Sequence, residues 1–180
     1  MTTEVIDPEG DLVLNCSGVL FLISSTVVSL ASTVIRQMLK MENEARFLRR
    51  ASTDTTKRIL RLARANPESC RIFSNVVHHR PDALPRNPDP HCLKHLAYFI
   101  SDYNCRASLK DRGQAWLLQP LRNRLKEDLW KLLELAYALR LQKNFFEITR
   151  QLLSTRLEPF RNWDLAKENL DVLPEAVIGL

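Results

Sequence analysis

A long stretch without charge near the N-terminus places the strongest constraint on how this chain can fold. Residues 12–35 contain no Asp, Glu, Lys or Arg, and Arg36 follows directly. A helix of that length could cross a bilayer. The stretch also carries Asn15 and seven Ser or Thr side chains, and such groups are costly in hydrocarbon without partners. We therefore interpret it as strands and helices of a globular domain, with a single-pass membrane protein spanning residues 12–35 as an alternative.

Apolar runs and a glycine mark the strands. Residues 12–14 predict a short strand, residues 15–18 a turn in which Gly18 supplies backbone freedom, and residues 19–23 a second strand. Because the second run is apolar throughout, we expect it to be covered on both faces. Residues 59–62 predict a third strand.

Capping residues mark where helices begin. Ser24 or Ser25 is expected to cap one helix and Ser32 the next, because a serine hydroxyl accepts hydrogen bonds from free amides of the first turn. Asn66 and Asp89 each precede a proline, which is typical of a helix start. The helices expected further along are 67–79, 90–103, 107–118, 127–141 and 143–153, with a short one near 164–170. Inward-facing side chains are expected to include Val28, Leu30, Ala31, Cys70, Phe73, Val76, Val77, Leu129, Leu132, Leu133, Ala136, Leu139, Phe146, Thr149, Leu152 and Leu153.

Composition indicates a cytoplasmic or nuclear protein of α+β class that is mostly helical. The 180 residues contain only four glycines, which leaves little room for tight hairpins or phosphate-binding loops. The four cysteines form no Cys-x-x-Cys motif, and the acidic N-terminus does not resemble a secretory signal, so we expect reduced thiols.

Positive charge is concentrated in one segment. Residues 36–64 hold nine Lys or Arg and three acids, a net charge of +6 in a chain whose total is +5. Such a segment is typical of a solvated basic face, and it is also the candidate partner-binding surface. The tryptophans are typical of a core or a helix interface, but one in the C-terminal tail could anchor a partner instead. The candidate partner-binding residues are Arg46, Arg49, Arg50, Lys57, Arg58 and Trp163.

The same basic segment supports an alternative function. Arg49-Arg50-Ala-Ser52 matches the pattern that basophilic kinases accept, so Ser52 is a candidate phosphorylation site. Lysines and arginines also bind nucleic-acid phosphates. The alternative is a basic nucleic-acid- or chromatin-associated factor that phosphorylation regulates.

We expect no catalytic activity, no cofactor and no metal site. No nucleophile, base and orienting carboxylate can be nominated, and no serine lies in a Gly-x-Ser-x-Gly turn. His91 and His95 would share a helix face and His78-His79 lie nearby in sequence, which is attractive for zinc. The second pair of ligands has no defined spacing, however, so we predict that the chain is not an enzyme and holds no metal.

Three stretches resemble the BTB/POZ domain, in particular its fungal type. They are Asp7-Pro-Glu-Gly-Asp-Leu-Val-Leu14 with the run from Phe21 to Leu39, then Asn66-Pro-Glu-Ser-Cys through Val-Val-His-His-Arg80, and Leu93-Lys-His-Leu-Ala-Tyr-Phe-Ile-Ser-Asp-Tyr-Asn-Cys105. Their order is that of the family. The resemblance implies a BTB/POZ-like domain over residues 5–118, in which a small N-terminal sheet packs on a helical cluster. Residues 119–180 would form a C-terminal helical extension and tail.

The resemblance also implies a function. BTB/POZ domains are non-catalytic protein–protein interaction modules, so the expected role is a scaffold or an adaptor, including a ubiquitin-ligase adaptor. The implied partners are proteins, among them a second copy of the chain or a cullin. Nucleic acid and membrane are not expected as partners. Two departures bear on this. The family's usual motif after the second helix is replaced by Phe47-Leu-Arg-Arg, and the loop around residues 83–85 lacks the apolar-x-Glu motif common in cullin-binding members.

Overall fold

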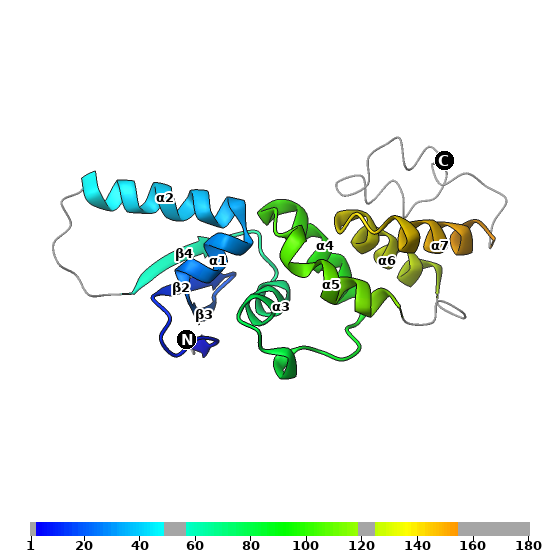
Figure 1. Cartoon of the computed structure of the whole chain (residues 1–180), viewed down its shortest axis with the longest axis horizontal. Helices are drawn as coiled ribbons and strands as arrows, with labels where there is room; N and C mark the ends of the chain where they lie inside the picture. Colours follow the sequence, from blue (N-terminus) through cyan, green and yellow to red (C-terminus); the bar gives the residue numbers. More distant parts are fainter. Residues whose placement is uncertain (1–2, 49–56, 119–124, 155–180) are drawn as a thin grey trace. The chain divides into compact units, whose positions relative to one another are not determined.

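The structure, a computed structural model, describes residues 3–48, 57–118 and 125–154. Figure 1 shows the elements in chain order. The strands are β1 (Thr3–Val5), β2 (Leu12–Cys16), β3 (Val19–Ile23) and β4 (Arg58–Leu62). The helices are α1 (Ser25–Ala31), α2 (Thr33–Leu48), α3 (Pro67–Val77), α4 (Pro90–Tyr103), α5 (Arg106–Leu117), α6 (Lys126–Ala138) and α7 (Gln142–Leu153), with a 3-10 turn at Pro81–Ala83. The fold is therefore α+β and mostly helical, as the sequence predicts.

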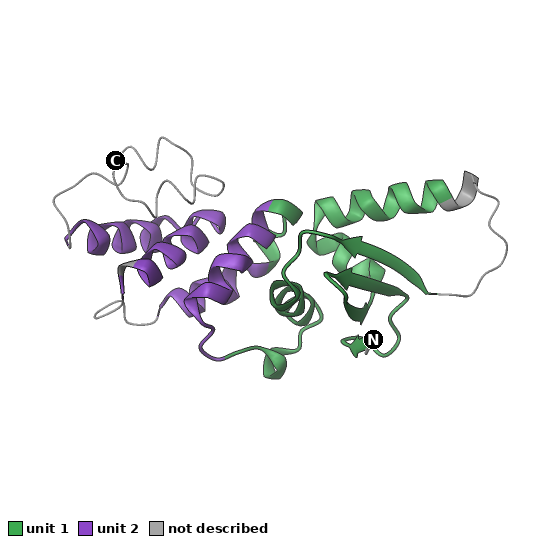
Figure 2. Cartoon of the chain, turned by 180° about the vertical axis from the view of Figure 1, so that it is seen from behind, with its two compact units in different colours: residues 1–85, 102–108 green, residues 86–101, 109–180 purple. Residues whose placement is uncertain are grey.

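The chain divides into two compact units, coloured separately in Figure 2. Unit 1 holds residues 1–85 and 102–108, and unit 2 holds residues 86–101 and 109–180. Unit 1 contains the whole sheet with α1, α2 and α3, whereas α6 and α7 belong to unit 2. Unit 1 is discontinuous in sequence, because the chain leaves it after residue 85 and returns to it at residue 102. The predicted boundary between residues 118 and 119 stays a prediction.

The sheet of unit 1 has the strand order β1-β3-β2-β4. β2 and β3 pair as an antiparallel hairpin, while β4 pairs parallel to β2 after the crossover through α1 and α2. The predicted 15–18 turn is shorter than expected, because β2 continues to Cys16 and only Ser17 and Gly18 remain between the strands. Both have positive φ, 50° and 92°, which matches the twist of a two-residue hairpin turn.

One face of this sheet carries the core of unit 1. Alternate residues of β2 are buried, as expected for period-two side-chain alternation, and so are most of their paired neighbours on β3 and β4. The exceptions are Val19 and Arg58, which are half-buried. The buried set is Leu12, Leu14, Cys16, Phe21, Ile23, Leu60 and Leu62. On the opposite face Leu22 is 8% exposed but Ile59 is 56% exposed. β3 is thus covered on both faces at its C-terminal end, as predicted, while β4 is covered on one.

Serine caps form where the sequence places them. The Ser24 hydroxyl accepts from the Val27 amide at 3.5 Å, and the Ser32 hydroxyl accepts from the Ile35 amide at 3.0 Å. Val28 is buried on the inward face of α1 as predicted, but Leu30 is 78% exposed, so that prediction is wrong. A seven-residue helix has room for only one inward stripe, and Val28 occupies it.

The membrane alternative fails on the same residues. Residues 12–35 form β2, a turn, β3, α1 and the start of α2, not one continuous helix. Among the helices that the structure describes, none has the length and apolar content that crossing a bilayer requires.

The later helices follow their sequence signals closely. The Asn66 side chain accepts from the amides of Glu68 and Ser69, and the Asp89 carboxylate accepts from the His91 amide at 2.6 Å. The whole predicted stripe of α6 is buried. On α7, however, Phe146 is 68% exposed, which contradicts its predicted inward orientation, and Leu153 is also exposed. The inward positions are taken by Ile148 and Leu152.

Candidate partner-binding surface

The predicted partner-binding residues fall only partly within the described chain. Arg58 is the first residue of β4, and Lys57 precedes it with an exposed side chain. Arg46 lies near the C-terminal end of α2. The remaining predicted residues, Arg49, Arg50, Ser52 and Trp163, lie outside the described residues.

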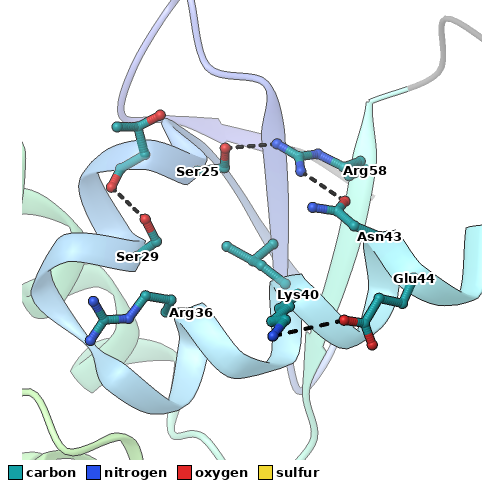
Figure 3. Close-up of a pocket in the computed structure, with 9 residues that line it drawn as sticks. Ser25, Ser29, Arg36, Lys40, Asn43, Glu44 and Arg58 are labelled. Atoms are coloured by element: carbon teal, nitrogen blue, oxygen red, sulfur yellow. Dashed lines mark hydrogen bonds and ion pairs between the residues drawn. The ribbon is translucent and has the colours of Figure 1, made fainter.

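Arg58 is the centre of a polar network that links the sheet to α1 and α2. Its guanidinium forms an ion pair with Asp11 and donates to the Ser25 hydroxyl at 2.7 Å and to the Asn43 side-chain oxygen at 3.2 Å. Figure 3 shows the contacts to Ser25 and Asn43. β4 starts beside β2, with Arg58 opposite Leu12 in the parallel register, which brings its side chain to Asp11.

Asp11 also closes the start of α1. Its carboxylate accepts from the Ser25 amide and from the Ser25 hydroxyl, both at 2.7 Å. Burial alone would raise the pKa of Asp11, but the hydrogen bonds from Ser25 and the bond and charge of Arg58 outweigh it and lower the pKa. The carboxylate therefore stays charged at neutral pH and fixes the guanidinium in place.

A pocket of about 320 Å³ lies beside this network. Residues of α1 supply hydroxyl groups, residues of α2 supply cations, and Leu39 of α2 is buried. Figure 3 shows these side chains around the pocket. The lining residues are Ser25, Thr26, Ser29, Arg36, Leu39, Lys40, Asn43, Glu44 and Arg58.

The three cations of the pocket differ in how fully they are neutralised. Arg58 is paired with Asp11, and Lys40 lies 3.9 Å from Glu44, one turn further along α2. Arg36 is exposed, and its side chain has no ion pair or hydrogen bond to any residue that the structure describes. The excess positive charge of this pocket therefore comes mainly from Arg36, and a positive charge of this kind attracts anionic groups.

The two histidine pairs singled out in the sequence have different structural roles. His78 Nε2 accepts from the Ser24 amide at 3.1 Å while Nδ1 lies 2.8 Å from the Ser74 carbonyl, so the ring joins α3 to the start of α1. His79 is exposed with a φ of 54°. His91 and His95 lie one turn apart on α4. Burial, together with the charges of His91 and Lys94, lowers the pKa of His95. In the described part of the chain, no three metal-binding side chains gather.

Sequence reasoning identified Arg58 but missed the residues that hold it. Asp11 and Asn43 are separated from Arg58 by 47 and 15 positions, and no local pattern connects them. The spacing of Arg36, Lys40 and Glu44 along one helix face could have been found, because residues three to four apart are neighbours on a helix. Compared with models of known protein families, the chain matches none, and no curated protein is significantly similar to it.

Proposed function

We propose that this chain is a non-catalytic protein–protein interaction module of BTB/POZ type, and that it binds an acidic segment of its partner at the α1–α2 pocket. The strand–turn–strand–helix–helix opening on which the resemblance rests is present as β2, β3, α1 and α2. α3 and α4 follow in the order that the other two resembling stretches predict. This order of elements supports the family assignment.

The observation that carries the binding proposal is that the unpaired Arg36 side chain and the fixed Arg58 line the same pocket. Arg58 is held by three side chains, so its position costs no further ordering when a partner binds. Arg36 supplies a free charge, and the hydroxyls of Ser29 and Thr26 line the same pocket. A carboxylate-bearing loop or helix end fits this chemistry.

The proposed partners follow from the family. They are a second copy of the chain and the N-terminal domain of a cullin. The proposed compartment is the cytoplasm or the nucleus, where such modules act. The role would be that of a scaffold, or of a ubiquitin-ligase adaptor if the cullin binds.

The first experiment is light scattering on the purified chain, alone and mixed with a cullin N-terminal domain. A mass above that of the monomer without the cullin supports self-association, and an increase on mixing supports the adaptor role. A monomer that gains no mass on mixing excludes both partners. Cross-linking in extracts would then be used to find another protein partner, and finding none would contradict the proposal.

A charge reversal locates the binding surface. Arg36→Glu combined with Lys40→Glu should weaken partner binding by about tenfold or more, because it turns attraction into repulsion. Lys110→Glu combined with Lys143→Glu, which reverses two exposed cations on α5 and α7, is the matched control and should leave binding unchanged. Equal effects of the two variants would remove the pocket from the proposal.

The alternative nucleic-acid function predicts a different result. A chain that binds phosphates through its basic segment is retained on a phosphate-bearing resin, and retention falls steeply as salt rises. Phosphomimetic Ser52→Glu should then weaken retention further. A chain that is not retained on the resin even at low salt, with Ser52→Glu behaving as the wild type, favours the interaction module.

A further inference from the structure

The imidazole rings of His91 and His95 lie against each other on α4. Their Nε2 atoms are 3.1 Å apart, and the ring centroids are 4.5 Å apart with the ring planes 82° from parallel. Both residues belong to unit 2 and to one helix, so their spacing is set by four residues of regular backbone.

We propose that His91 and His95 form a binding site for a divalent transition-metal ion, with water completing the coordination. Two imidazole nitrogens that bind one ion at about 2.0–2.1 Å, with bond angles of about 90–110°, lie roughly 2.9–3.4 Å apart. The observed 3.1 Å between the Nε2 atoms falls in this range. The pair is therefore arranged for an ion without any movement of the helix.

Ion binding here requires a change of tautomer and a turn of the rings about their side-chain bonds, so that both lone pairs meet at the ion. In the metal-free pair one Nε2–H donates to the Nε2 lone pair of the other ring. When an ion binds, that proton leaves Nε2 and the same ring takes up a proton from water at Nδ1. Both rings stay neutral and both Nε2 lone pairs point to the ion.

The surroundings leave the ion accessible. His91 is exposed and His95 is half-buried, so water can fill the open positions. The carboxylate of Asp89 lies at the His91 amide and adds negative charge nearby. The charge of Lys94, which already lowers the pKa of His95, opposes the ion. Its ammonium lies over the Tyr98 ring, 5.8 Å from the ring centre. Two nitrogen ligands and open positions favour copper, nickel or zinc over magnesium or calcium, which prefer oxygen.

The two-ligand geometry separates this site from the zinc site that the sequence analysis set aside. A structural zinc site needs four protein ligands, and the described residues offer no group of three. A pair binds an ion reversibly through the chelate effect alone. The site would therefore respond to the concentration of free metal and would not be required for folding.

The test uses the full chain without a polyhistidine tag, titrated calorimetrically with Ni²⁺ and with Zn²⁺ under reducing conditions. One ion should bind per chain. His91→Gln and His95→Gln should each weaken binding by about tenfold or more, because each leaves a single ligand. His79→Asn, which removes an exposed histidine from unit 1 and suits its positive φ, is the control and should change affinity less than twofold.

Two outcomes would overturn the proposal. Wild-type binding no tighter than that of a His91→Gln, His95→Gln double variant means that the pair does not chelate. Binding that survives both single variants but is lost in Cys92→Ser means that the thiol holds the ion instead. Circular dichroism of each variant shows whether the helices are intact, so that a loss of binding is not a loss of fold.

Discussion

The hydroxyl of Ser32 donates a 2.5 Å hydrogen bond to the carbonyl oxygen of Tyr103, which lies 71 positions later in the chain. The same hydroxyl oxygen accepts from the Ile35 amide and so caps α2. Ser32 is fully buried. One small side chain therefore satisfies a helix start and a distant carbonyl within unit 1.

Ser32→Ala is expected to destabilise the protein by about 2–4 kcal/mol. It removes a cap worth about 1 kcal/mol, and it also removes the hydrogen bond to the Tyr103 carbonyl inside the protein, at a cost of about 1–3 kcal/mol. Ser24→Ala removes only a cap, whose bond is long at 3.5 Å, and should cost about 1 kcal/mol or less. Urea unfolding of both variants checks this, and similar losses would show that the Tyr103 contact contributes little.

Alanine at two glycines should have unequal effects. At Gly10 an added Cβ would lie 2.6 Å from the Ile23 carbonyl oxygen, a backbone atom that cannot move without disturbing β3. At Gly113 it would meet the end of the Leu139 side chain, which can rotate, and alanine also favours the helix by about 1 kcal/mol. We expect Gly10→Ala to cost roughly 2–3 kcal/mol and Gly113→Ala distinctly less. Thermal unfolding of the two variants gives the order of their stabilities. A larger loss of stability in Gly113→Ala than in Gly10→Ala would contradict this prediction.

Glu134 should make stability fall as pH rises. The residue is fully buried on α6, and desolvation raises its pKa from 4.5 to about 7 against the opposing effects of Lys94, Trp130 and Lys131. Because the folded carboxyl binds its proton more tightly than the unfolded one, its contribution is complete below about pH 4.5. That contribution is lost as the pH rises from about 4.5 to about 7, which lowers the free energy of unfolding by roughly 3 kcal/mol.

Glu134→Gln removes this titration. The variant should be more stable than the wild type at pH 8 by about 1–3 kcal/mol, and the difference should vanish near pH 4.5. Glu147→Gln, an exposed carboxylate on α7, is the control. Urea midpoints measured from pH 4.5 to 8 decide the matter, and parallel profiles for wild type and Glu134→Gln would show that the carboxyl does not titrate in this range.

Alkylation should separate the four cysteines, all of which are free thiols. Cys16, Cys70 and Cys105 are buried, whereas Cys92 is half-buried. Burial, and then the neighbouring Cys16, raises the pKa of Cys70, and burial raises the pKa of Cys105 to about 12. Since the thiolate is the reactive form, iodoacetamide at pH 8 should modify Cys92 first and the others only in urea. Mass spectrometry reads the order, and early modification of Cys70 would contradict the packing.

Local signals in the sequence were enough to place most elements. The caps at Ser24, Ser32 and Asn66 and the apolar stripe of α6 depend on neighbours within one or two turns, and all were found. β1 was missed, because Thr3–Val5 is a strand only through its parallel pairing with β3. Leu30 and Phe146 were wrongly predicted to face inward. The sequence pattern of an apolar residue beside a buried stripe is the same whether or not another element packs over that residue.

The candidate surface shows a sharper limit. Charge density along the sequence pointed to the segment that contains Arg58, but not to its partner Asp11, which is brought close by strand pairing. The spacing of His91 and His95 indicated a shared face, while the 3.1 Å between their nitrogens depends on side-chain rotamers that spacing does not determine.

The discontinuity of unit 1 has a consequence for synthesis on the ribosome. The chain leaves this unit at Pro85 and returns at Asp102, and the returning residues complete earlier ones: the Asn104 side chain donates to Thr33, and the Ser108 hydroxyl donates to the Ala31 carbonyl. The sheet and first helices thus emerge from the exit tunnel well before the residues that finish them. A nascent chain arrested at residue 85 would hold an incomplete unit, open to chaperones and proteases until about twenty further residues appear.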